Sequence, residues 1–417
     1  MRRLKKYLMV MLTLLALTIC AMGLVSCDFG KENEEDKGEL AFTLLDDGTY
    51  EVSGIGTYTD TDIIIPLDYK GVPVTAIGED SFKRCYKLTG IQIPNSVVTI
   101  GASAFSECYS LKSLEMPNSV TGIGAYAFSN CDGLTKIEIP DNVTAIDRGV
   151  FNDCGSLASA KIPNGVTEIS EDAFRGCYSL TKIEIPDSVI AIGDNAFRDC
   201  FNLTNVTMGN GITTLGSYVF GNCGSLTEIV IPNSVISIGR NAFGECDGLT
   251  EIVIPDSVTT LEAGAFAYCI NLTSVVIGDG VTAIGDSTFS GCSHLTSVEI
   301  PDNVTAIGHS AFNGCINLTS VVMGNGVKTI GDRAFYGCNN LTSVSLGNNV
   351  ERLGAYAFAY CSILTGIVIP YGVTKLGECA FFDCDSLTIY CQTPKKPNGW
   401  NENWNKDDCP VVWGHKA

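Results

Sequence analysis

The stretch that decides the fold is residues 88–110, LTGIQIPNSVVTIGASAFSECYS, because its pattern returns in each following block of 23 residues. Cysteine recurs at this spacing fourteen times, from Cys85 to Cys384, without an insertion. A phenylalanine stands three places before each of these cysteines, and a leucine stands three places after each. A period of roughly 20–29 residues with leucine at fixed offsets indicates a solenoid of stacked coils rather than separate globular domains.

Each repeat reads as one coil with two short extended segments. Residues 91–93 alternate apolar, polar and apolar, which predicts a strand with one buried face. Pro94 lacks an N–H and ends that strand, and residues 97–101 predict a second extended piece. Residues 104–108 predict a helical turn whose Ala, Phe and Cys point inward. One coil cannot bury its apolar face alone, so the copies are expected to stack into one core.

We therefore predict an α/β repeat solenoid, dominated by β structure, in which parallel short strands and short helical turns form a right-handed coil. The solenoid is expected over residues 76–391, as fourteen repeats of 23 residues. Residues 41–75 read as an N-terminal β cap with a hairpin turn at Asp46-Asp47-Gly48. Residues 392–417 read as a C-terminal cap that contains every tryptophan of the chain, Trp400, Trp404 and Trp413. These rings cover the last coil or, alternatively, stack on sugar rings.

The N-terminal residues have the pattern of a targeting signal. Four positive residues precede an apolar run over residues 7–25, which is the pattern of a secretory signal peptide, here residues 1–26. The run ends in LVSC, residues 24–27, which resembles the bacterial lipobox and implies lipidation of Cys27. A transmembrane anchor and a plain secretory signal remain alternatives. Residues 27–40 read as an acidic tether, so we expect an extracytoplasmic protein that is lipid-anchored to a membrane at the cell surface.

The repeat unit LTxIxIPxxVxxIGxxAFxxC resembles the BspA-like leucine-rich repeats of bacterial cell surfaces, over roughly residues 41–413. The resemblance implies adhesion, with extracellular protein partners such as host matrix or plasma proteins, or with the surface of another microbe. It brings no family-wide catalytic residue and no cofactor. The alternative function is a structural spacer or assembly partner at the cell envelope.

The regular cysteines are expected to be buried free thiols. Equivalent positions on stacked coils have parallel Cβ vectors about 4.8 Å apart, whereas a disulfide needs Cβ atoms about 3.8 Å apart. A single column also offers no tetrahedral set of ligands for zinc, so no metal site is expected. Cys391 and Cys409, which flank the tryptophan-rich cap, form the candidate disulfide, and Cys379 could compete for either partner.

Composition argues against several classes of function. The formal net charge of the 417-residue chain is −20, and nucleic acid or an anionic lipid surface requires a basic patch instead. The three histidines, His294, His309 and His415, occupy variable repeat positions, and no nucleophile–base set accompanies them. We therefore expect no catalytic residues, no cofactor, no enzyme activity and no nucleic-acid partner.

The outward column of the first strand supplies the candidate ligand-binding residues. Its N-terminal half is largely charged, whereas Val230, Val253 and Val276 occupy three consecutive coils and Val322 lies two coils further on. Exposed apolar stripes often mark interfaces, but valine also favours strands without any binding role. A neighbouring column of threonines, from Thr181 to Thr342, is open to the same two interpretations, and a structural hydrogen bond between coils is the favoured one.

Overall fold

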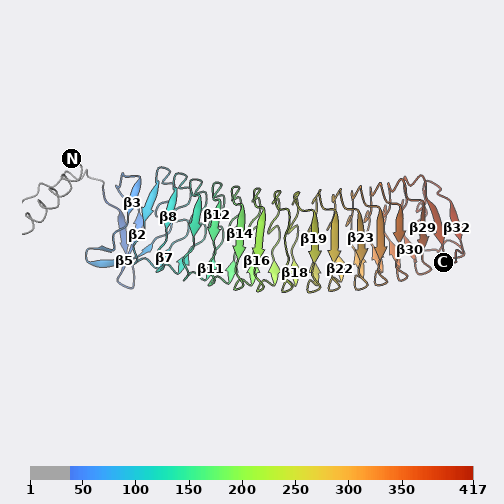
Figure 1. Cartoon of the computed structure of the whole chain (residues 1–417), viewed down its shortest axis with the longest axis horizontal. Helices are drawn as coiled ribbons and strands as arrows, with labels where there is room; N and C mark the ends of the chain where they lie inside the picture. The colour runs from blue at the N-terminus through green and yellow to red at the C-terminus, as the bar shows by residue number, and fades with distance from the viewer. Residues whose placement is uncertain (1–37, 417) are drawn as a thin grey trace, which may run out of the picture.

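The computed structural model describes residues 38–416, which form one elongated rod of stacked coils (Figure 1). Every coil but the one at residues 228–231 contributes a strand to one long face of the rod, which we call the strand face. Its strands are β3 (Asp62–Ile64), β6 (Gly90–Gln92), β8 (Ser113–Glu115), β10 (Lys136–Glu138), β12 (Ser159–Lys161), β14 (Lys182–Ile185), β16 (Asn205–Met208), β19 (Glu251–Ile254), β21 (Ser274–Ile277), β23 (Ser297–Ile300), β25 (Ser320–Met323), β27 (Ser343–Ser345), β29 (Gly366–Ile369), β31 (Thr388–Cys391) and β32 (Val411–Trp413).

A second face consists of two-residue strands, preceded by the longer β5 (Val72–Ile77). The two-residue strands are β7 (Thr99–Ile100), β9 (Gly122–Ile123), β11 (Ala145–Ile146), β13 (Glu168–Ile169), β15 (Ala191–Ile192), β17 (Thr214–Leu215), β18 (Ser237–Ile238), β20 (Thr260–Leu261), β22 (Ala283–Ile284), β24 (Ala306–Ile307), β26 (Thr329–Ile330), β28 (Arg352–Leu353) and β30 (Lys375–Leu376). The N-terminal cap adds β1 (Ala41–Leu44), β2 (Tyr50–Gly54) and β4 (Asp68–Tyr69).

Neighbouring coils pair in parallel with the 23-residue register that the sequence predicts. Ile183 of β14 pairs with Val206 of β16 on the strand face, and Ile192 of β15 pairs with Leu215 of β17 on the second face. The strand face is divided into several ladders, and residues 228–231, between β16 and β19, form no strand. The register carries every inward position onto its equivalent in the next coil, so like residues stack on like.

The third side of each coil corrects the prediction of short helical turns. It consists of consecutive turns, and no helix occurs in the described part of the chain. Two residues of each such segment have a left-handed backbone, for example Ser103 at φ 51° and Glu107 at φ 61°. The N–H of Phe105 donates to the carbonyl of Ala127 in the next coil (2.7 Å), and the N–H of Cys108 donates to the carbonyl of Phe105 (3.1 Å). Because alternate amides bond across coils, the segment cannot close the continuous ladder that an α-helix requires.

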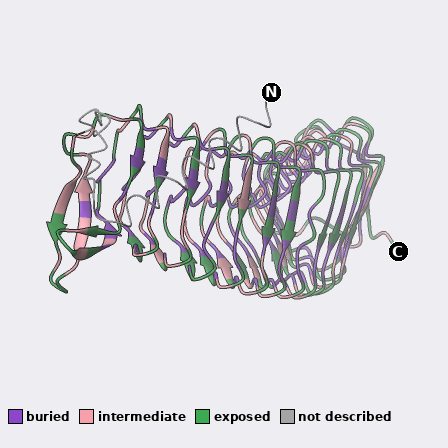
Figure 2. Cartoon of the chain, turned by 60° about the vertical axis from the view of Figure 1, so that its left-hand side comes forward, coloured by how far each residue is buried: buried purple, intermediate pink, exposed green. Residues whose placement is uncertain are grey.

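The column of phenylalanines lies at the centre of the core. Phe105 stacks on Phe82 and on Phe128, with ring centroids 5.2 Å apart on either side. The same contact recurs along the column to Phe381, and no ring of the column is more than 1% exposed. Figure 2 shows buried segments recurring along the coils. Stacked aromatic pairs add to the free energy of apolar burial, so this column binds each coil to its neighbours.

The cysteine column is inward-facing, as predicted, and its thiols also form hydrogen bonds to backbone carbonyls. The Cys108 thiol donates to the carbonyl oxygen of Phe82 in the preceding coil at 3.1 Å. Twelve further cysteines, up to Cys384, repeat this contact. Alanine or valine would fill similar space but could not donate to this carbonyl. The seventeen cysteines within residues 38–416 are all free thiols.

The candidate disulfide between Cys391 and Cys409 is not formed in the structure. Cys391 pairs with Trp413 of β32, which lies four residues after Cys409. At about 3.3 Å per extended residue, this register separates the two cysteines by about 13 Å along the strand direction, whereas the Cα atoms of a disulfide lie about 4.4–6.8 Å apart. The Cys409 thiol instead donates to the carbonyl of Cys384 at 3.8 Å, and Cys379 is also free and buried.

Both ends of the rod are covered. At the N-terminal end, β1 and β2 form the predicted antiparallel hairpin, and β2 pairs with β5. At the other end, Trp400 and Trp404 are 3% and 5% exposed, and the indole N–H of Trp400 donates to the carbonyl of Val373 at 2.9 Å. The tryptophans therefore cover the last coil. The expected signal peptide, the lipidation site Cys27 and most of the acidic tether lie outside the described residues.

The first prediction concerns the phenylalanine column. Replacing Phe220, which is fully buried between Phe197 and Phe243, with alanine is expected to lower the free energy of unfolding by about 3–5 kcal/mol. The matched control is Phe201→Ala, because Phe201 is 42% exposed, and its loss is expected to cost less than about 1 kcal/mol. Urea unfolding followed by circular dichroism measures both. Equal costs for the two variants would contradict the proposed role of the column.

The second prediction concerns pH. Burial raises the pKa of Cys108, Cys154, Cys269 and Cys338 from the ordinary 9.0 to about 12, so the folded chain holds these protons more tightly than the unfolded chain does. Their contribution to stability is therefore complete below about pH 9 and is lost as the pH rises from about 9 to about 12. Urea midpoints measured across that range should fall, and Cys154→Ala/Cys269→Ala/Cys338→Ala should fall less steeply. An unchanged slope in this variant would show that other groups control alkaline unfolding.

Candidate ligand-binding face

The four candidate valines all point outward from the strand face. Val230 is 79% exposed, Val253 59%, Val276 54% and Val322 47%. Within β19 the neighbours of Val253 point into the core, because alternate residues of a strand face opposite sides. Val253 pairs with Val276 in the ladder of β19 and β21, so these side chains form a continuous row across the coils.

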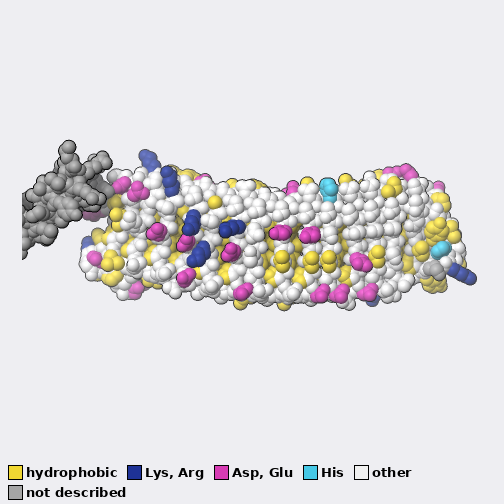
Figure 3. Space-filling view, viewed as in Figure 1, with side chains coloured by type: hydrophobic (Ala, Val, Ile, Leu, Met, Phe, Trp, Pro, Cys, Tyr) yellow, Lys and Arg dark blue, Asp and Glu magenta, His cyan; other side chains and the backbone are white. Residues whose placement is uncertain are grey.

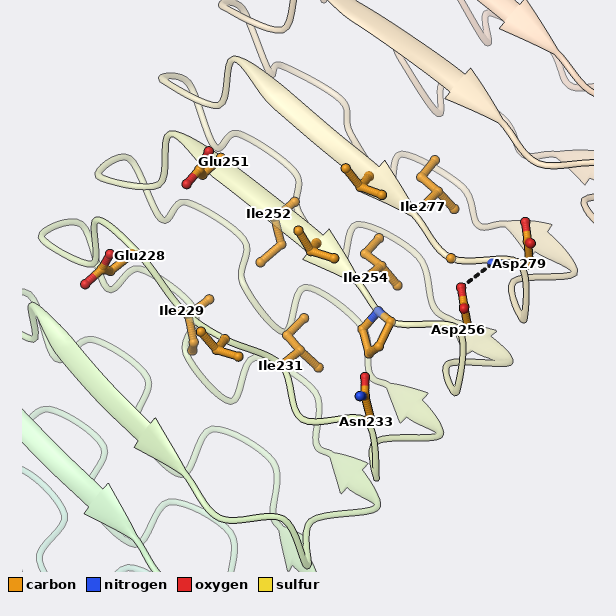
Figure 4. Close-up of a pocket in the computed structure, with 15 residues that line it drawn as sticks. Glu228, Ile229, Ile231, Asn233, Glu251, Ile252, Ile254, Asp256, Ile277 and Asp279 are labelled. Atoms are coloured by element: carbon orange, nitrogen blue, oxygen red, sulfur yellow. Dashed lines mark hydrogen bonds between the residues drawn. The ribbon is translucent and has the colours of Figure 1, made fainter.

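The row lies at the floor of a shallow groove of about 670 Å³ on the strand face. Figure 4 shows acidic side chains at both ends of the strands that cross the groove. Asp256 and Asp279 are linked at one rim, where Asp256 Oδ1 accepts the backbone N–H of Asp279 at 2.9 Å. We call this site the Val groove and define it by its floor and its two rims: Val230, Val253 and Val276; Glu228 and Glu251; Asp256 and Asp279.

Val322 belongs to an adjoining hollow rather than to the Val groove. This second hollow, of about 490 Å³, is lined by Val276, Glu299 and Val322 among others. Glu299 pairs with Val322 in the ladder of β23 and β25 and stands between the two parts of the valine column. The structure thus brings together three of the four predicted valines and separates the fourth from them by a carboxylate.

Charge is distributed unevenly along the rod. Residues 201–327 contain ten Asp and Glu residues but a single cation, Arg240. The N-terminal half of the strand face instead carries lysines beside its acids, with Lys136 forming an ion pair with Glu138. Figure 3 shows a row of hydrophobic side chains on the strand face with acidic side chains beside it, while Lys and Arg gather nearer the N-terminal end. The Val groove is therefore the apolar and uncompensated acidic part of this face.

The threonine column has the structural role that the sequence favoured. Thr204 Oγ1 donates to the carbonyl oxygen of Thr181 at 3.0 Å, and Thr273 Oγ1 donates to that of Thr250 at 2.9 Å. Thr296, Thr319 and Thr342 repeat the contact with the preceding coil. These five hydroxyl groups thereby help to hold neighbouring coils together.

Exposed aromatic stacks on the turn side are a feature that sequence reasoning missed. Tyr86 stacks on Tyr109 with ring centroids 5.5 Å apart, and Tyr178 stacks on Phe201 at 5.4 Å. Each of these rings follows a column cysteine by one residue, so the repeat alignment contained the signal. These stacks cover part of the outer surface, and the hydroxyl of Tyr109 donates to the Glu107 carboxylate at 3.4 Å.

Neither a metal centre nor a membrane span is apparent within residues 38–416. No three His, Cys, Asp or Glu side chains gather there in a way that could hold a metal ion. Over the same residues the chain has no helix of the length and apolar character needed to span a bilayer. The His294 ring contacts the carbonyl of Ile270 at 2.7 Å, which is an ordinary structural contact between coils.

Comparison with known proteins agrees with the repeat architecture. A model of the BspA type leucine-rich repeat region matches in six copies, over residues 75–200, 167–296 and 260–388. A leucine-rich repeat protein from Bacteroides ovatus is similar over 90% of this chain and 98% of its own, with 26% identity and a TM-score of 0.59. A leucine-rich cell surface protein from Faecalibacterium prausnitzii is 31% identical over 74% of this chain and 93% of its own, with a TM-score of 0.48. No curated protein matches.

The third prediction separates the groove from the core beneath it. Val253→Thr/Val276→Thr is expected to change the free energy of unfolding by less than about 0.5 kcal/mol per site, because both side chains already face water. Ile252→Thr, one residue from Val253 but only 2% exposed, is expected to cost about 2 kcal/mol or more, because it buries a hydroxyl and opens a void. Urea unfolding compares them. A large loss in the valine variant would mean that the row serves packing instead of binding.

Proposed function

Because the chain belongs to the BspA-type leucine-rich repeat family, we propose that it is a cell-surface adhesion protein whose solenoid binds protein or glycan ligands. Its partners would be an extracellular protein, such as a host matrix or plasma protein, or the surface of another microbe. The single observation that carries this proposal is the Val groove, where three consecutive coils expose valines that no neighbouring side chain covers. Contiguous exposed apolar surface often marks an interaction site.

The location forms part of the proposal. A relative from Faecalibacterium prausnitzii is named as a cell surface protein. The charged n-region, the apolar run and the LVSC sequence support export and lipidation at Cys27 of this chain. A lipid anchor followed by an acidic tether would hold the rod outside a membrane, with its strand face accessible to partners.

We propose a non-catalytic role. Within residues 38–416, the phenylalanine, leucine and cysteine side chains of the repeats lie in the core, and threonine hydroxyls such as that of Thr204 bond to the neighbouring coil. Burial raises the pKa of the column thiols from Cys85 to Cys361, for example that of Cys108 to about 12, which keeps them protonated and poor as nucleophiles.

The alternative function is a spacer or assembly partner at the cell envelope. The continuous coil-to-coil bonding of the rod favours this reading, because a stacked solenoid holds its two ends at a set distance. A spacer has no use for an open apolar row, however, and exposed valines add the risk of unwanted association. The two functions therefore differ in whether the strand face binds saturably.

The fourth prediction tests adhesion directly. The full chain, immobilised on beads, is expected to capture a component from a panel of purified matrix and plasma proteins or to retain whole microbial cells, and the binding should saturate. Val253→Thr/Val276→Thr should capture less, whereas Ile190→Thr/Ile236→Thr, a matched pair of exposed β-branched residues outside the groove, should capture normally. Surface binding measured by interferometry gives the comparison. A native chain that retains nothing from the whole panel would favour the spacer.

A further inference from the structure

We propose that the Val groove holds a basic amphipathic segment of the partner protein, with apolar side chains on the valines and Lys or Arg side chains beside the rim carboxylates. This inference rests on the proposed binding function and specifies the chemistry of the segment that is bound. The observation behind it is that an apolar floor lies between two acidic rims. The floor alone would predict only an apolar ligand, and the rims alone would predict only a basic one.

The floor requires apolar side chains from its occupant. Val230, Val253 and Val276 stand on consecutive coils and are each more than half exposed. With about 4.8 Å between coils, the three side chains span roughly 10 Å along the rod. Two turns of an amphipathic helix or a few residues of an extended chain match that length. The floor has no aromatic ring, so it lacks the surface on which sugar rings usually stack.

The rims require positive charge. Among the described residues, the carboxylates of Glu228, Glu251 and Asp279 form no hydrogen bond and no salt bridge with another side chain. Asp256 uses only Oδ1, which accepts the N–H of Asp279. Arg240 is the sole cation over residues 201–327, so this part of the chain cannot neutralise its own acids. Lys or Arg side chains of a partner would supply the missing charge and the missing donors.

Neither the N-terminal half of the strand face nor a second copy of the chain fits this proposal as well. On the N-terminal half of the strand face, lysines already neutralise part of the acid, as Lys136 does for Glu138. A second copy of this chain is also a poor occupant, because face-to-face pairing of two grooves would place carboxylates against carboxylates. A basic amphipathic segment avoids both problems.

The fifth prediction uses a synthetic peptide of about twelve residues that alternates lysine and valine, so that one side is basic and the other apolar. It is expected to bind the full chain saturably in fluorescence anisotropy, and the affinity should fall as salt is raised, because exposed charges are screened. Two matched peptides separate the contributions: lysine alternating with serine keeps the charge, and glutamate alternating with valine keeps the apolar side. Both are expected to bind at least about tenfold more weakly.

Variants of the chain locate the binding. Glu228→Gln/Glu251→Gln/Asp279→Asn and Val253→Thr/Val276→Thr are each expected to weaken the lysine–valine peptide by about tenfold. Glu79→Gln/Glu378→Gln/Glu402→Gln is the charge control, because it removes three exposed carboxylates near the ends of the rod. It should bind like the native chain. Equal loss in the control would mean that net charge, and not the groove, attracts the peptide.

Other outcomes overturn the inference without touching the proposed function. If the native chain captures a matrix protein or a cell but the groove variants capture it equally well, the inference fails and adhesion stands. If the lysine–serine or glutamate–valine peptide binds as tightly as the lysine–valine peptide, the pairing of apolar and basic groups is wrong. If the chain binds the peptide but captures no natural component, the groove chemistry stands and the adhesive role fails.

Discussion

The 23-residue step from coil to coil is the constraint on which the whole structure depends. The same step aligns the parallel strands, stacks Phe105 on Phe82, and carries the thiol of Cys108 to the carbonyl of the preceding coil. It also aligns the turn amides that bond across coils. A single inserted residue would break all of these contacts at one place, which explains why fourteen consecutive repeats keep one length.

Because the inward residues of every coil take part in this stacking, the coils differ from one another mainly at their outward positions. On the strand face, lysines lie beside the acidic residues in the N-terminal half of the rod. In the other half, valines lie among acidic residues. The threonine hydroxyls, although exposed, bond to the neighbouring coil and leave little freedom for a ligand. The valine row is thus a local departure on a scaffold that is otherwise repetitive.

The cysteine column shows how one residue type satisfies two demands of such a core. Its side chain is small and apolar enough to pack beside phenylalanine, and its S–H reaches a carbonyl that already accepts one amide. Burial raises the pKa of these thiols from Cys85 to Cys361, which keeps the donor proton in place. Near the C-terminal end the same logic applies to Cys409, whose thiol points to the carbonyl of Cys384 and not to Cys391.

The sequence by itself determined the solenoid, its period, the inward columns and the outward position of Val230, Val253, Val276 and Val322, because a strict repeat makes each position's environment readable from its neighbours. It misjudged the turn side, although the two left-handed positions of each coil are rich in Gly, Asn and Asp, as at Asn195 and Asp199, which are the residue types that this backbone conformation favours. It also misjudged Cys391 and Cys409, because their separation depends on the register with which β32 closes the last coil. Only the tertiary structure decided that three valines share a groove, that Glu299 separates the fourth from them, and that the rim carboxylates of Glu228, Glu251 and Asp279 have no partner among the described residues. These properties arise from side chains that meet across coils, which are distant in sequence and adjacent only after stacking.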